Sequence, residues 1–181
     1  MLMTLCGCQT IKHSYPDSTN YEFVTQALEP LGGTIKKPRS WKYSEHHGGP
    51  SFVWTLSREH NENGSYETGM RIQLIIGTKE VFGKSAEEFC QEFLDSKAET
   101  LNVIDYFPQI QSGIFNREGV KVLENLPTDD GVKEFNITYS TFWIEDIAII
   151  TIAGTPSELW EEYKGTFKAM TEFVPFDTRR L

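Results

Sequence analysis

Residues 147–153 constrain the fold more than any other segment of this 181-residue chain. Their sequence, IAIITIA, is apolar at every position except one Thr. An uninterrupted apolar run of this length is typical of a strand covered on both faces, whereas a half-exposed strand alternates apolar and polar residues. The segment therefore predicts a central strand in a sheet that has other elements packed on both sides.

Further strand patterns lie on either side of a helical region in the sequence. Strands are predicted at 52–56, 70–76, 113–123, 135–140, 142–144 and 147–153. Turn residues separate several of them, including Asn63-Gly64, Asp129-Asp130-Gly131 and Glu145-Asp146. Short connections of this kind join antiparallel neighbours, so we expect an antiparallel sheet.

Two segments carry the signature of a helix start. Ser85 and Glu88 have capping-box spacing and precede apolar residues at helical intervals, which predicts a helix over 85–101. Thr155 and Glu158 repeat this spacing around Pro156, which predicts a helix over 156–173. Residues 21–28 fit either a short helix or a strand. Together these elements predict one α+β domain over residues 21–177, an antiparallel sheet flanked by helices.

Composition excludes some functional classes. The chain has 17 Lys and Arg against 26 Asp and Glu, a formal net charge of −9. This acidic balance argues against a nucleic-acid partner, because such proteins need a basic face. With 39% hydrophobic and 24% charged residues the chain is typical of a globular protein. No stretch approaches 18 consecutive apolar residues, so the sequence predicts no spanning helix.

The first residues predict a lipid anchor. The stretch Leu5-Cys6-Gly7-Cys8 resembles a bacterial lipobox, in which the last cysteine carries the lipid on its sulfur. Residues 1–8 then represent the remnant of a signal that begins upstream of Met1, and the polar residues 9–20 form a flexible tether. Gln9 after the cysteine favours the outer membrane, facing the periplasm. Two alternatives remain: a disordered start of a cytoplasmic protein, and a metal or redox pair formed by Cys6 and Cys8.

The body of the chain resembles the PsbP-like fold family. This family includes bacterial lipoproteins, photosystem extrinsic subunits and a Ran-binding nuclear protein. The resemblance covers about residues 32–175 and begins at Pro38-Arg39-Ser40-Trp41, where Ser40 replaces the family's glycine. It continues in the hairpin 131–153 and in the helix residues Pro156, Ser157, Glu158, Leu159, Trp160, Phe167, Met170 and Phe173. The resemblance implies an α/β/α sandwich and supplies no catalytic residue, because the family has no shared active site.

Two clusters are candidate binding sites. Glu45, His46 and His47, joined by His60, could hold Zn or Cu through imidazole and carboxylate groups. The alternative is an exposed polar turn before Gly48-Gly49-Pro50, and adjacent histidines in an extended segment point to opposite faces. Trp41, Tyr43 and Trp54 could form a binding surface if exposed, and otherwise belong to the core.

The sequence thus favours a cell-envelope lipoprotein, anchored in the membrane at Cys8, that binds a protein partner without catalysis and without a cofactor. One alternative is an envelope protein that binds a metal or small ligand near His46. A second is a cytoplasmic chaperone of a secreted toxin with the same fold. An enzyme is the least favoured class, because no catalytic motif accompanies the histidines or the cysteines.

Overall fold

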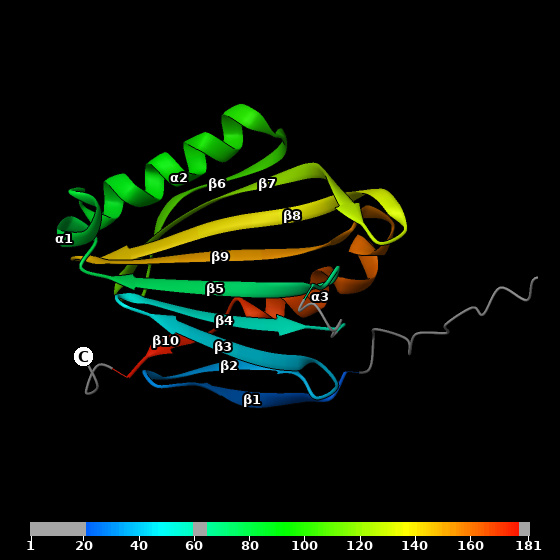
Figure 1. Cartoon of the computed structure of the whole chain (residues 1–181), viewed down its shortest axis with the longest axis horizontal. Helices are drawn as coiled ribbons and strands as arrows, with labels where there is room; N and C mark the ends of the chain where they lie inside the picture. The colour runs from blue at the N-terminus through cyan, green and yellow to red at the C-terminus, as the bar shows by residue number, and fades with distance from the viewer. Residues whose placement is uncertain (1–20, 60–64, 178–181) are drawn as a thin grey trace, which may run out of the picture.

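The computed structural model describes residues 21–59 and 65–177 (Figure 1). Their main feature is a seven-stranded antiparallel sheet with the strand order β3-β4-β5-β9-β8-β7-β6. The strands, in that order, are Lys42–Gly48, Ser51–Ser57, Gly69–Ile76, Ile147–Pro156, Gly131–Ile144, Phe115–Thr128 and Asn102–Ser112. The predicted antiparallel arrangement is confirmed, and every neighbouring pair in this sheet is antiparallel.

A second, smaller sheet has the order β1-β2-β10 and is also antiparallel. Its strands are Phe23–Leu28, Gly32–Pro38 and Val174–Phe176. Residues 21–28, which fit either a helix or a strand, therefore contain a strand. The helices of the described residues are α1 (Thr78–Phe82), α2 (Ala86–Thr100) and α3 (Trp160–Met170), the last preceded by the 3₁₀ turn Ser157–Leu159. None of these helices is long and apolar enough to span a membrane.

The large sheet is covered on both faces, as its central strand predicts. Trp143 packs with Cys90 of α2, whereas its neighbour Phe142 belongs to the main core, which includes residues of α3 and of the small sheet. Adjacent strand residues point to opposite faces, so α2 lies on one face and α3 with the small sheet on the other (Figure 1). Strand β9 lies at the centre, where Ala148 and Ile149 are both 0% exposed. The arrangement is an α/β/α sandwich.

One predicted helix start is confirmed and the other is wrong. The Ser85 hydroxyl accepts a hydrogen bond from the Glu88 amide, and the Glu88 carboxylate accepts one from the Ser85 amide. At the second site β9 continues to Pro156, and α3 begins only at Trp160. Thr155 does not cap a helix because its hydroxyl is paired with that of buried Thr68, 2.9 Å away.

Candidate functional site

Three of the four predicted metal ligands lie on a strand, so the prediction of a loop there is wrong. Glu45, His46 and His47 belong to β3, which pairs along its length with β4. Glu45 and His47 share one face, where the His47 Nε2 lies 3.7 Å from the Glu45 Oε1. The Tyr43 hydroxyl donates to the other Glu45 oxygen at 2.6 Å. His46 points to the opposite face because side chains alternate along a strand.

The two adjacent histidines therefore lie on opposite faces of β3, as expected for neighbours in an extended segment. Within residues 21–59 and 65–177, no group of three or more His, Cys, Asp or Glu side chains could hold a metal ion. His60, the fourth predicted ligand, lies outside the described residues, as does the lipidation residue Cys8. A metal site here stays a prediction. Burial raises the pKa of the Tyr43 hydroxyl, and the Glu45 carboxylate adds to the rise, so Tyr43 stays a hydrogen-bond donor at neutral pH.

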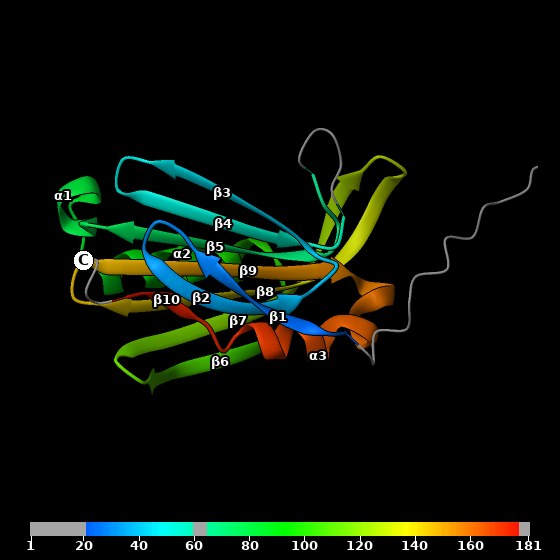
Figure 2. The same cartoon turned by 90° about the horizontal axis from the view of Figure 1, so that it is seen from below.

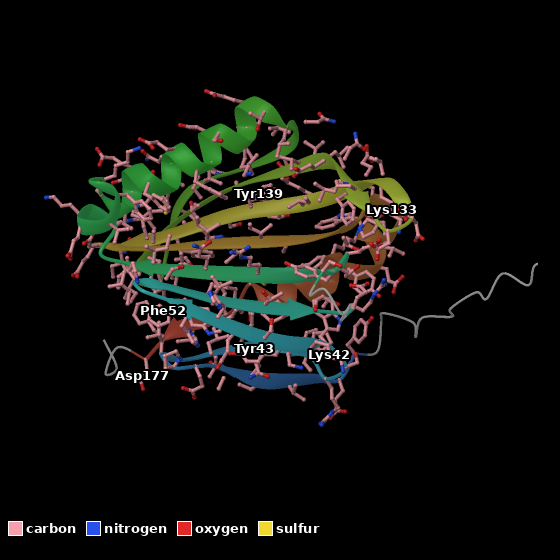
Figure 3. All side chains as sticks on the ribbon, in the orientation of Figure 1. Lys42, Tyr43, Phe52, Lys133, Tyr139 and Asp177 are labelled. Carbon is pink, nitrogen blue, oxygen red and sulfur yellow. The ribbon has the colours of Figure 1, made fainter. Side chains whose placement is uncertain are left out.

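Two of the three candidate binding aromatics belong to the core. Trp41 is 2% exposed and packs against Tyr163 and Phe167, while Trp54 is 0% exposed. The Trp54 indole donates to the Glu29 carbonyl oxygen at 2.8 Å. Both rings are thus covered by the small sheet and α3 and offer no surface to a partner. Of the three, only Tyr43 is partly exposed. It lies on β3, next to β4, which carries Phe52 (Figure 3).

Strand β6 is one of the two edge strands of the large sheet, and like β3 it has no buried residue. It is 11 residues long. Three large apolar side chains are nevertheless present: Ile104, Tyr106 and Ile110 are 45%, 64% and 53% exposed. Figure 2 shows β6 at the outer margin of the molecule beside β7. Exposed apolar side chains on an open sheet edge are typical of an interaction surface.

A pocket lies on the α3 side of the sheet, next to the hairpin formed by β6 and β7. It has a volume of about 320 Å³, and its lining includes Phe142, Phe173, Arg117 and Lys168. Arg117 and Phe142 are paired residues of β7 and β8, so their side chains share one face. The Arg117 guanidinium lies 5.2 Å from the centre of the Phe142 ring. Burial lowers the pKa of Arg117, which still leaves it charged at neutral pH.

Sequence reasoning identified neither Arg117 nor β6. Arg117 lies inside a predicted strand, where a single charged residue is ordinary. Its partner across the strands, Phe142, is 25 positions away, and Lys168 is farther still. The two charged residues between Phe115 and Val120 were the available signal, because burying a charge needs compensation.

Comparison with known proteins identifies the fold. No protein-family model and no curated protein matches the sequence. Among solved structures, the solution structure of cyanobacterial PsbP (CyanoP) from Synechocystis sp. PCC 6803 covers 94% of this chain and 97% of its own, with a TM-score of 0.51. The chain has a PsbP-like fold. This confirms the fold that the sequence resembles, and at 11% identity the likeness concerns the fold alone.

A second solved structure is a protein from Bacteroides thetaiotaomicron VPI-5482. It is 12% identical, with a TM-score of 0.44, over 78% of this chain and 46% of that chain. The function of this PsbP-like domain must therefore be argued from its own surface.

Proposed function

We propose that this PsbP-like domain is a non-enzymatic binding module of the cell envelope, which is tethered by a lipid on Cys8 and recognises a protein partner along β6. The observation that carries the proposal is the apolar edge formed by Ile104, Tyr106 and Ile110. An open edge supplies backbone donors and acceptors, and apolar side chains beside it supply the area that a partner can bury. Such a surface offers binding groups rather than an acid, a base or a nucleophile.

The chemistry of β6 suits an extended, nearly neutral segment of the partner chain. Asp105 is the one charged residue between Asn102 and Ser112. Pro108 and two irregularities in the pairing with β7 interrupt the edge, which restricts unselective strand addition. The partner segment would therefore pair with short stretches of backbone and cover the apolar side chains.

The opposite edge of the sheet provides a contrast. Strand β3 has 7 residues and presents mostly polar side chains, including Lys42, Ser44 and His46. Charged and polar residues on an edge strand oppose strand addition. The two edges are therefore distinct surfaces, and β3 serves as a matched control for β6.

Substitutions on β6 test the partner-binding proposal. We expect Tyr106→Lys combined with Ile110→Lys to reduce capture of a specific envelope protein by about tenfold or more, because both apolar contacts are lost. The matched control is Ser44→Lys with His46→Lys, which places two charges on the exposed β3 edge and should leave capture unchanged. Thermal melts would show that both variants stay folded. Equal capture by the wild type and the β6 variant would overturn the proposal.

Lipid attachment is tested separately, with the gene expressed together with its upstream DNA. Metabolic labelling with a tagged fatty acid should label the wild type, and Cys8→Ala should abolish the label, because the lipid is carried on the cysteine sulfur. Cys6→Ala is the matched control and should keep the label. Label that persists in Cys8→Ala, or no label in the wild type, would contradict the lipid tether. Either result would favour the alternative of a cytoplasmic protein.

A further inference from the structure

The pocket beside Arg117 combines an apolar interior with positive charge. Phe142 and Ile149 are 8% and 0% exposed and contribute the buried part of its lining. Phe173 of the segment after α3 packs edge-on against Phe142, with the two ring centres 5.5 Å apart. The pocket is thus lined by aromatic rings, and its volume of about 320 Å³ is at the small end of the range for ligand sites.

Arg117 differs from Arg39 and Arg58 in its partners. Arg39 is exposed and forms a bidentate ion pair with Glu22, and half-buried Arg58 forms an ion pair with Glu59. Among the described residues, no carboxylate lies within ion-pair distance of Arg117, although its side chain is partly buried. Its contact is the face of the Phe142 ring. A partly desolvated guanidinium without a counter-ion has unused capacity for an anion.

The remaining charges of the pocket also bear on the anion. Lys168 of α3 adds a second positive charge to the lining, and Glu172 adds one negative charge. Neither side chain forms an ion pair with another described residue within 4 Å. The lining therefore has a net charge of +1, in a chain whose formal net charge is −9. Ser112 and Thr171 contribute hydroxyl groups to the same lining.

We propose that this pocket binds a small monocarboxylate with an apolar, ring-sized body. The guanidinium fork matches the two oxygens of a carboxylate, and Lys168 adds to the attraction. The rings of Phe142 and Phe173 then receive the apolar body of the ligand. This inference goes beyond the proposed function, because it requires neither the lipid nor the partner at β6. The same chemistry is offered by a free acid and by the C-terminal carboxylate of a peptide ending in Phe.

Calorimetric titration of the purified protein with phenylacetate tests the proposal. We expect saturable binding with a Kd on the order of 0.1–1 mM, as suits so small a ligand. The uncharged analogue 2-phenylethanol should bind about tenfold more weakly or not at all, because it lacks the charge that Arg117 recognises. No saturable binding of phenylacetate, or equal binding of the alcohol, would overturn the proposal.

Variants locate the site within the structure. Arg117→Met keeps an unbranched apolar stem, removes the guanidinium group, and should weaken phenylacetate binding by about tenfold or more. Arg117→Lys should weaken it less, because the charge remains while the fork is lost. The matched control is Arg71→Met, an exposed arginine of β5 that lies on the opposite face of the sheet and should leave binding unchanged. A folded Arg117→Met variant, judged by its melting temperature, that binds like the wild type would contradict the assignment.

Two peptides distinguish the source of the carboxylate. A tripeptide ending in Phe is titrated beside the same peptide with a C-terminal amide. Tighter binding of the free-acid peptide than of phenylacetate would assign the site to a chain terminus. Weaker binding of that peptide, with phenylacetate still bound, would assign the site to a free small acid. Equal binding of the acid and amide forms would contradict carboxylate recognition.

Discussion

Replacing Trp54 by Ala is expected to lower the free energy of unfolding by about 3–5 kcal/mol, one of the largest losses available to a single substitution. The ring is 0% exposed and belongs to the main core between the large sheet and the small one. Its removal leaves a cavity and also leaves the Glu29 carbonyl oxygen without the indole donor 2.8 Å away. For a domain of this size the melting temperature should fall by roughly 6–20 °C.

Denaturant unfolding followed by circular dichroism measures this loss. Trp160→Ala is the matched control, because it removes the same side chain from a partly exposed position on α3. There the indole stacks on Phe167 and lies beneath the Lys121 ammonium, 3.8 Å from the ring centre. We expect the control to lose less than half as much stability. Equal losses of stability would contradict the full burial of Trp54 in the core.

Gly33→Ala is expected to have the second-largest effect, about 2–3 kcal/mol of lost stability. A Cβ at this position of β2 would lie 2.3 Å from the Pro175 carbonyl oxygen and 2.4 Å from that of Val174. Both atoms belong to the backbone of β10, so no change of side-chain conformation relieves the clash. Strand β10 would have to move away, and Phe176, which is 5% exposed, would leave the core.

Gly165→Ala is expected to have the opposite effect and to raise stability. Gly165 lies inside α3, and a Cβ there would meet nothing within 4 Å. Alanine in an exposed helix interior is favoured over glycine by about 0.5–1 kcal/mol, so stability should rise. Thermal melts of the two variants compare the signs directly. A Gly33→Ala variant as stable as the wild type would contradict the close packing of β2 against β10.

Elements with strong local signals were predicted correctly. Strand β9 was predicted from an apolar run that is typical of a doubly covered strand, and α2 from the capping box of Ser85 and Glu88. In both cases the determining interactions lie within a few residues of one another. The resemblance to the PsbP-like fold depended on residues 38–41, the hairpin 131–153 and the C-terminal helix, and the sandwich is as it implied.

Elements that depend on distant contacts were predicted wrongly or missed. The start of α3 moved because Thr155 bonds to Thr68, 87 positions away, in place of capping a helix. Strand β3 has the polar sequence KYSEHHG and is extended because β4 pairs with it. Strand β6 is exposed on both sides, so its residues do not alternate, and its pairing with β7 determines its conformation.

The candidate sites also differ in whether they depend on local patterns or on distant contacts. The histidine cluster was a local pattern, and the alternation of side chains along β3 separates its members. The Arg117 pocket joins β7, β8, α3 and β10, and only the topology of the sheet brings Arg117, Phe142 and Lys168 together. The periodicity of the sequence does not predict that these three residues lie together.

The central claim is that β6 is the surface at which this domain meets its partner. Site-specific photo-cross-linking in cells tests it most directly, with a photoreactive phenylalanine at Tyr106 of β6 or at Lys42 of β3, both exposed positions of edge strands. The proposal predicts one specific protein adduct from Tyr106 and none from Lys42. An adduct from Lys42 alone, or no adduct from Tyr106, would contradict it.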